Sequence, residues 1–450
     1  MHWSKLPALD GDPERDHLAE FRADRFGFFR RVGQELGDIG QVRTGWLTGA
    51  YVNAPAMVQE VLADRSDDYL KSPALYMYMR PMIGNGLLAS EDPVHKRARR
   101  IVAPAFQAKR VLAYADAIVE ETARTLPGWG QRVDIAKEMT ALTLRIVSRT
   151  LFHSTSEVDG QILEESFSAA GRILIRLMNE PLPILPGPLV ESARELKQVV
   201  ERIDAIVMRV IGERRASGEE KVDVLSMLLG AKDEETGKGL SDPELRDEVL
   251  TLFLAGHETT ANALTWAWQL LAAHPEVRAR LEREVAEVLG ERPATYADAE
   301  KLSYTLCVFK ETLRLYPVVY FTARLAKVDT QIGPWQVPAG TTVFVNFAGL
   351  HRRADAFPEP QRFDPDRFKD AADRRWPKGS YLPFGAGPRV CPGNYFAMLE
   401  GQLVLATIAQ RYRLSRRGKP TKAEALVTLR PKGAVWMNVE RSAFAAKAEL

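Results

Sequence analysis

The chain has 450 residues, and its 61 Lys and Arg nearly balance its 59 Asp and Glu, which leaves a formal net charge of +2. Hydrophobic residues make up 46% of the sequence and charged residues 27%, values that are ordinary for a globular protein and that exclude a disordered or collagen-like chain. The near-zero net charge gives no reason to expect nucleic acid as a partner.

Cysteine usage and the N-terminus indicate the compartment. Two cysteines, Cys307 and Cys391, exclude a disulfide framework and a cysteine-rich zinc site, and they fit a reducing compartment. Residues 1–10 lack the apolar core of a signal peptide. No stretch approaches the roughly 18 consecutive apolar residues that span a bilayer. We therefore expect a cytoplasmic protein without a membrane span.

Helical patterning with short polar breaks dominates the first 300 residues, and strand-like pieces are few. A prior of about 150 residues per domain suggests roughly three domains, but no Gly/Ser-rich or Pro-rich linker divides the chain. We predict a single, mainly α domain over residues 1–450. Its smaller β-rich part is expected at approximately 36–60 and 322–350.

One helix can be placed by its local signals. Ser241 and Glu244 form a capping box, and the helical pattern runs to His274, where Pro275 interrupts it. About 33 residues at 1.5 Å each give a helix of roughly 50 Å, long enough to cross a domain. Residues 255–260 at its centre read Ala-Gly-His-Glu-Thr-Thr.

This centre breaks the usual preferences of a helix interior. Gly and Thr are poor helix formers, and the charged Glu258 closely follows the apolar run 249–254. A local rule broken in the middle of an element marks a place where function is expected. We therefore expect a functional site at this centre of the helix.

Two further helices carry or follow chemical motifs. The first leads into Glu311 and Arg314, which are three residues apart and so share a helix face at ion-pair distance; Pro317 ends it. The second covers residues 394–412 and turns apolar positions inward.

The strongest chemical signal is the loop 384–393. Its glycines and prolines deliver Cys391 to the start of a helix, where backbone N–H groups lower a thiol pKa, and Arg389 adds a positive charge. Cys307 lies in an apolar helical stretch and is expected to be core. A thiolate on such a loop serves as a nucleophile or as a metal ligand. A nucleophile needs a base, and no His is near in sequence, whereas a haem ligand needs only N–H donors and room for the macrocycle.

These residues resemble the cytochrome P-450 monooxygenases. The haem-binding pattern of that family is matched at Phe384, Gly387, Cys391 and Gly393. Four other family motifs occur in family order, so the resemblance covers nearly the whole chain: an early propionate-binding helix at 95–106, the oxygen-activating segment at 255–260, Glu-x-x-Arg at 311–314, and a segment with a second arginine at 365–368.

The resemblance implies the fold, the cofactor and several residue roles. The fold would be mainly α, with a long central helix over the haem. Haem b would be the cofactor, with Cys391 as axial ligand of the iron, and dioxygen the co-substrate. A break in the middle of the long helix would be a groove beside the iron where oxygen binds, and Glu258 and Thr259 would be the acid–alcohol pair that delivers protons to dioxygen. The haem propionates would meet four cations: His95, Arg99, Arg324 and Arg389.

The resemblance also implies a supporting network and a pocket. Glu311, Arg314 and Arg367 would form a buried ion network beneath the haem loop. The pocket residues are apolar or aromatic, so the substrate should be hydrophobic, whether a fatty acid, terpenoid, steroid or polyketide: Leu75, Tyr78, Leu87, Leu252, Ala255, Val319 and Tyr320.

Electrons are expected from another protein, because no Gly-x-Gly-x-x-Gly nucleotide loop is present. An acidic ferredoxin or flavodoxin with its NAD(P)H reductase would dock on Lys96, Arg97 and Arg100, and the chain would act as a monomer. Two alternatives are a peroxide-driven thiolate-haem peroxygenase and a non-catalytic haem-binding protein. Neither of them needs the pair Glu258 and Thr259.

Overall fold

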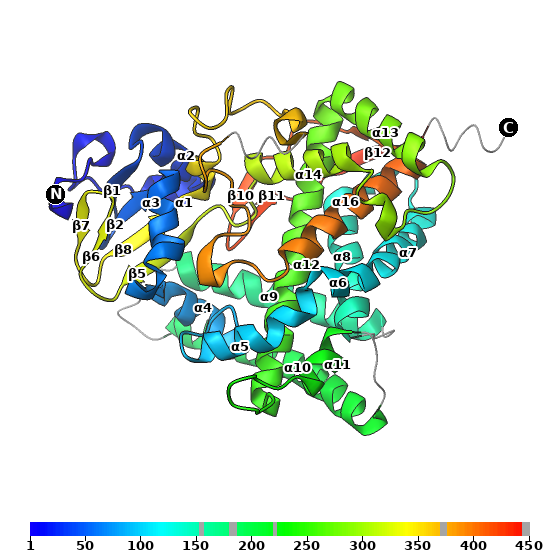
Figure 1. The fold of residues 1–450 in the computed structure, drawn as a ribbon, viewed down its shortest axis with the longest axis horizontal. Coiled ribbons are helices and arrows are strands. Elements are labelled where there is room, and N and C mark those ends of the chain that lie inside the picture. The colour runs from blue at the N-terminus through cyan, green and yellow to red at the C-terminus, as the bar shows by residue number, and fades with distance from the viewer. Residues whose placement is uncertain (153–156, 180–186, 219–222, 370–375, 443–450) are drawn as a thin grey trace.

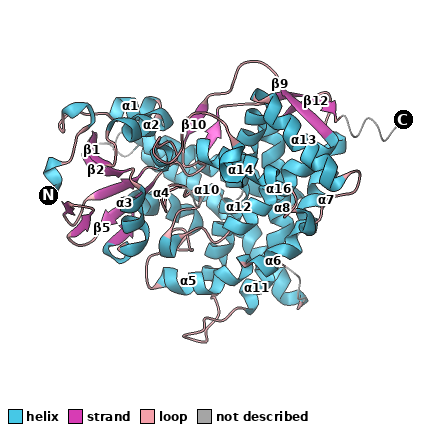
Figure 2. Cartoon of the chain, turned by 45° about the horizontal axis from the view of Figure 1, so that its top comes forward, coloured by secondary structure: helices cyan, strands magenta, loops and turns pink. Residues whose placement is uncertain are grey.

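A computed structural model describes residues 1–152, 157–179, 187–218, 223–369 and 376–442. Its main sheet lies at the end of the molecule that holds the N-terminus, most of its long helices fill the other end, and β12 (Trp436–Arg441) lies at that other end near the C-terminus (Figures 1 and 2). Among the described helices, none is long and apolar enough to cross a membrane.

The helices have the following bounds in chain order. Those of the first half are α1 (Leu18–Ala23), α2 (Arg25–Glu35), α3 (Pro55–Gln59), α4 (Pro73–Ile83), α5 (Val94–Val102), α6 (Ala108–Val111), α7 (Ala115–Thr125), α8 (Ile135–Phe152), α9 (Glu157–Asn179) and α10 (Gly187–Ser217). Those of the second half are α11 (Val224–Gly230), α12 (Asp242–Ala273), α13 (Pro275–Leu289), α14 (Ser303–Leu315), α15 (Phe347–Leu350) and α16 (Asn394–Arg411).

The largest sheet joins the two predicted β-rich regions. Its strand order is β1-β2-β8-β5-β3, with β2 and β8 parallel and the other pairs antiparallel. The edge strand β3, which was not predicted, is only three residues long. The bounds are β1 (Ile39–Thr44), β2 (Leu47–Val52), β3 (Tyr69–Lys71), β5 (Thr322–Ala326) and β8 (Thr342–Val345).

Three small sheets complete the β structure. Hairpins β6–β7 and β10–β11 each have two strands, and a third sheet has the order β4-β12-β9. Their bounds are β4 (Arg132–Asp134), β6 (Thr330–Ile332), β7 (Trp335–Val337), β9 (Tyr412–Arg416), β10 (Ala423–Ala425), β11 (Leu429–Pro431) and β12 (Trp436–Arg441).

The long helix α12 confirms the prediction from its caps. The backbone N–H of Ser241 donates to the Glu244 carboxylate at 2.8 Å, and α13 begins at Pro275. The expected central break is wrong, because the helix runs without interruption through residues 255–260. Gly256 serves packing there: a Cβ on it would lie 3.0 Å from a Val147 methyl of α8.

The hydrophobic core has one large part among the long helices and smaller parts around the main sheet. The largest cluster of buried side chains joins the long helices and includes Cys307, which confirms it as a core residue. Two smaller clusters lie around the main sheet. Helix α16 contributes Leu403 and Ile408, both fully buried, to the large cluster. The loop 384–393 leads directly into α16, so this packing anchors the cysteine loop at its C-terminal end.

Candidate active site

The cysteine loop is held by its own backbone and by one close approach. The backbone N–H of Cys391 donates to the Phe384 carbonyl at 3.0 Å, which closes the loop on itself. Gly387 has a φ of 71°, and a Cβ there would collide with the Leu62 carbonyl oxygen. Glycine is therefore required at position 387, both for its left-handed backbone and for space.

The environment of the Cys391 thiol differs from the prediction. Burial raises the pKa of Cys391, while a hydrogen bond from the Gly393 N–H and the charge of Arg99 act to lower it. The cation near the sulfur is thus Arg99 and not Arg389, which forms an ion pair with Glu91. The thiol pKa is raised and not lowered because desolvation outweighs these two contributions. A coordinated metal ion deprotonates a thiol outright.

A group of basic side chains, called the cation group below, lies close to this loop, with Glu91 paired to Arg389 and Asp92 beside His95. Burial lowers the pKa of His95 to about 4, and Arg389 and Lys71 lower it further. Burial, with Arg389 beside it, also lowers the pKa of Arg324 to about 10. Crowded cations favour binding of an anionic group, and the two propionates of a haem would supply that charge.

Solvent exposure indicates that these residues line an internal space. Arg324 and Cys391 are partly exposed, yet desolvation by the surrounding protein dominates the pKa shift of each. A side chain that lies deep in the protein and still has solvent-accessible surface must line a cavity. Ala255 is exposed at the middle of α12, between buried turns.

Lys71 on β3 is a member of the cation group that the sequence analysis missed. Its Nζ donates to the carbonyls of Leu87, Leu88 and Ser90 at 2.9, 2.7 and 2.7 Å, and burial lowers its pKa to about 7. No motif marks this lysine, and its strand is too short to show a period. Only the pairing of Lys71 with Arg324 between β3 and β5 brings it to the site.

The two members of the predicted acid–alcohol pair make separate contacts. The Thr259 hydroxyl donates to the Ala255 carbonyl of its own helix at 2.6 Å. The Glu258 carboxylate accepts from the Thr428 hydroxyl at 2.6 Å, and the Asn262 amide donates to that hydroxyl at 3.3 Å. Thr428 was missed because nothing in the sequence connects residue 428 to this helix, and Asn262 was missed because its role depends on Thr428.

The predicted pocket residues go to several places. Tyr320 is 1% exposed, packs among Phe26, Phe29 and Phe321, and donates its hydroxyl to the Leu426 carbonyl. It therefore belongs to the aromatic core beside the sheet and not to a pocket, because its ring and its hydroxyl are both satisfied there. Val319, the neighbour of Tyr320 in sequence, is 41% exposed.

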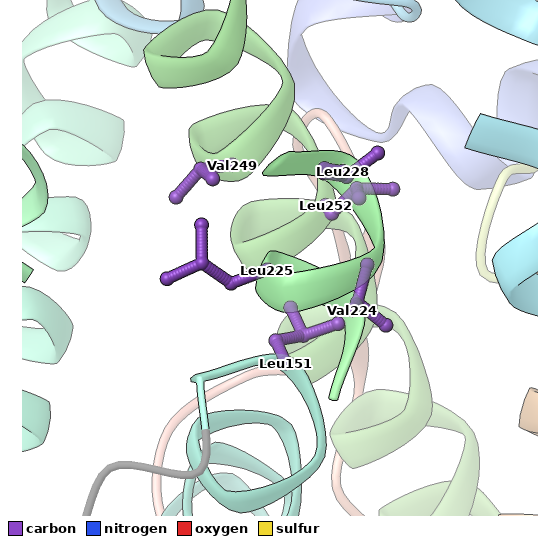
Figure 3. A pocket seen from close by; sticks show the side chains of 6 residues that line it. All are labelled: Leu151, Val224, Leu225, Leu228, Val249 and Leu252. Atoms are coloured by element: carbon purple, nitrogen blue, oxygen red, sulfur yellow. The ribbon is translucent and has the colours of Figure 1, made fainter. Parts of the chain in front are cut away.

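Leu252 lines a small apolar pocket between α8, α11 and α12 (Figure 3). The figure shows six aliphatic side chains converging there: Leu151, Val224, Leu225, Leu228, Val249 and Leu252. Leu87 is 6% exposed and lies in the loop after α4. Leu75 and Tyr78 belong to α4, but their side chains lie outside the described part of the chain.

The predicted ion network is assembled on α14. Two Arg314 nitrogens donate to the two Glu311 carboxylate oxygens at 2.7 and 2.8 Å, and the Arg367 guanidinium lies 3.4 Å from Glu311. Arg314 and Glu311 are fully buried. The remaining Arg314 donors reach backbone carbonyls in the segment that precedes the haem loop: His351, Pro360 and Arg362.

Fold and site together define a haem-thiolate protein of mainly α structure. The family described as Cytochrome P450 matches residues 16–437, and the chain belongs to this family. A solved structure, the haem domain of cytochrome P450DA, superimposes with a TM-score of 0.86 at 29% identity and covers 97% of each chain.

Two curated relatives come from Streptomyces melanosporofaciens. Cyclooctatin synthase is 36% identical over 422 residues, which cover 92% of this chain and 90% of the relative. Cyclooctat-9-en-7-ol 5-monooxygenase is 36% identical over 388 residues, or 84% of this chain and 83% of the relative. The protein is a cytochrome P450 monooxygenase that uses haem b, with dioxygen as co-substrate.

The residues present fit the haem. Cys391 would ligate the iron, while His95, Arg324 and Arg389 would meet the propionates. The haem supplies the redox chemistry that activates dioxygen, and a thiolate ligand favours O–O cleavage. The chain itself provides the N–H from Gly393 toward the sulfur.

Proposed function

We propose that this monooxygenase inserts one oxygen atom into a cyclic terpenoid hydrocarbon or alcohol, by hydroxylation or epoxidation. The relatives whose names state a substrate or product support this class, since one of them oxygenates cyclooctat-9-en-7-ol. The observation that carries the proposal is the exposed apolar surface of Ala255 in the middle of α12, in a protein whose cysteine loop and cation group fit a haem. Apolar walls select a hydrophobic substrate.

Within this function, Glu258 and Thr259 are the proton-delivering residues. Two protons must reach dioxygen for O–O cleavage, and a carboxylic acid with a hydroxyl can pass them on. Thr259 holds its hydroxyl one turn below Ala255, and the Glu258 carboxylate is held by Thr428. Because no hydrogen bond joins the two side chains among the described residues, a bridging water completes the relay.

The electron donor in this proposal is a ferredoxin or flavodoxin with an NAD(P)H reductase. The expected basic face is largely neutralised by carboxylates. Lys96 lies 3.1 Å from Asp92, Arg97 lies 2.5 Å from Glu244 and Arg100 lies 2.7 Å from Asp233. Paired charges steer a partner weakly, so the rate of reduction should depend on ionic strength less steeply than three unpaired cations would require.

The cell compartment and the oligomeric state belong to the same proposal. Both cysteines are free thiols, which supports a reducing cytoplasm. We propose that the protein acts there as a monomer with a separate electron donor.

The test is turnover of cyclooctat-9-en-7-ol by the haem-loaded chain. Ferredoxin, its reductase, NADPH and labelled dioxygen should give a product that carries one labelled oxygen atom. NADPH without the partner proteins should give none. Product from peroxide but not from the redox partners would support a peroxygenase instead. Absence of both a binding-induced Soret shift and a product would remove this terpenoid from the proposal.

A further inference from the structure

The segment after α4 lies directly against the first half of α12. Gly84 has a φ of 61°, and a Cβ on it would overlap the Asp247 carboxylate. A Cβ on Gly86 would come within 2.4 Å of the Thr251 hydroxyl and 2.6 Å of the Asp247 carbonyl. Both glycines are therefore required for a contact in which backbone meets helix.

Two consecutive carboxylates of α12 accept the backbone N–H groups of this segment. Asp247 accepts from the N–H of Asn85 at 2.7 Å, and Glu248 accepts from the N–H of Leu87 at 3.1 Å. Glu248 is 3% exposed. A buried carboxylate is costly unless it is hydrogen-bonded, so this contact holds the segment at a defined place on the helix.

The carbonyl groups of the same segment are held from the opposite side. Lys71 donates to the carbonyls of Leu87 and Leu88 as well as to that of Ser90. The backbone around Leu87 is thus fastened by acceptors from α12 and by a donor from β3. The position of this segment relative to α12 is therefore fixed by hydrogen bonds from side chains, and not by regular secondary structure within the segment.

The residue before the two acids extends the contact to a neighbouring helix. Arg246 donates to Asp204 of α10 at 2.7 Å, to Asp247 at 2.8 Å and to the Met82 carbonyl at the end of α4 at 3.3 Å. Three successive charged residues of α12 therefore join α10, the end of α4 and the segment 84–88.

We propose that Glu248, assisted by Asp247, is a specificity-determining positioning residue. By holding the backbone of Leu87, it sets the shape of the space beside the exposed Ala255, two turns along the same helix. The proposal deepens the proposed function, because it concerns the same substrate site. Neither acid is placed among the groups that contact the haem or deliver protons.

The first test measures the hydrogen bond between the Leu87 amide and Glu248 by amide hydrogen exchange of the haem-loaded protein. Glu248→Ala should raise the exchange rate of the Leu87 amide by at least about tenfold, because its acceptor is lost. Glu248→Gln keeps an acceptor oxygen and should retain most of the protection. Unchanged exchange at Leu87 in Glu248→Ala would overturn the proposal.

The second test measures the shape of the site with two ligands of haem iron. In Glu248→Ala, binding of 4-phenylimidazole should weaken by about three- to tenfold, because its ring loses a pre-ordered wall. Binding of imidazole, which is smaller, should change by less than about twofold. Azole binding is read from the Soret shift and needs no knowledge of the substrate. A failure of the terpenoid proposal would therefore leave this test intact.

Two further variants keep the test decisive if Glu248→Ala does not fold. Gly86→Ala should push the segment away from Thr251 without touching a charge, and it should reproduce the change in azole preference. Asp247→Ala should raise exchange at Asn85. The matched control is Glu284→Ala, which removes a carboxylate that accepts the N–H groups of Tyr304 and Thr305 elsewhere. An equal change of azole preference in Glu284→Ala, or none in Gly86→Ala, would contradict the proposal.

Discussion

The hydroxyl of Thr428 donates a hydrogen bond to the carboxylate of Glu258 at 2.6 Å, although 170 positions separate the two residues. Thr428 precedes β11, and that strand is itself fastened nearby: the Trp266 indole donates to the Leu429 carbonyl at 3.1 Å, and the Leu429 N–H donates to the Val318 carbonyl at 2.8 Å. The hairpin thus fixes the partner that holds the Glu258 carboxylate of α12.

Removing this hydroxyl should therefore impair proton delivery without disturbing the haem. Thr428→Val is expected to lower product formed per NADPH consumed by about two- to tenfold and to change the solvent isotope effect on turnover, because Glu258 loses a partner that orients it. Thr428→Ser should restore both values. An unchanged isotope effect in Thr428→Val would show that the contact is merely structural.

Thr259→Ala addresses the alcohol of the same pair. The variant should bind haem and substrate as before, since the Thr259 hydroxyl donates to the Ala255 carbonyl of its own helix. It should consume NADPH but divert the electrons to hydrogen peroxide, because the proton relay lacks its hydroxyl. The measurement is the ratio of product to peroxide, and a ratio equal to that of the parent protein would exclude Thr259 from the relay.

The two cysteines should behave in opposite ways. Cys391→Ser should abolish the red-shifted Soret band of the carbon monoxide complex of the reduced protein, because that band requires a thiolate ligand. Cys307→Ser should keep the band, since burial raises the pKa of Cys307 to about 11 and its thiol remains neutral in the core. Retention of the band in both variants would disprove the assignment of the ligand.

Breaking the ion network of α14 should lower the free energy of unfolding substantially. Glu311→Gln leaves the buried Arg314 without its charge partner, and breaking a buried pair in this way costs about 3–5 kcal/mol. Chemical denaturation of the haem-loaded protein measures this loss. The exposed pair of Lys197 and Glu201, 3.8 Å apart, gives the control: Lys197→Gln should cost about 0–1 kcal/mol. Equal losses in the two variants would contradict a buried network.

Glu400 on α16 gives a prediction about pH. Burial raises its pKa from 4.5 to about 8, although the Thr260 hydroxyl beside it acts to lower the pKa. The folded chain therefore binds more protons at this site than the unfolded chain between these pH values. The free energy of unfolding must then fall as pH rises from 4.5 to 8, by at most about 1.4 kcal/mol per pH unit.

Glu400→Gln should remove this contribution. Its unfolding free energy should decline less steeply between pH 5 and pH 8 than that of the parent protein, and the variant should be the more stable of the two at the alkaline end. Parallel curves over this range would show that Glu400 does not stay protonated in the folded chain.

Local signals in the sequence were sufficient for the helices that carry the chemistry. The capping box of Ser241 and the proline at 275 bound α12 correctly, and the loop 384–393 was identified by its glycines and its cysteine. A cap, a proline or a glycine acts within a few residues of its own position, so its effect can be read from the chain in order. The assignment of residues 1–450 to one domain remains a prediction.

The partners of these residues depended on contacts between distant parts of the chain. Lys71 reaches the cation group only because β3 pairs with β5, and Thr428 reaches Glu258 only because a hairpin packs against α12. Tyr320 lies beside the exposed Val319 in sequence but turns into the aromatic core. Desolvation, which raises the pKa of Cys391, likewise depends on the whole surrounding structure. Burial and long-range hydrogen bonds are properties of the packed chain, so residue order alone does not contain them in readable form.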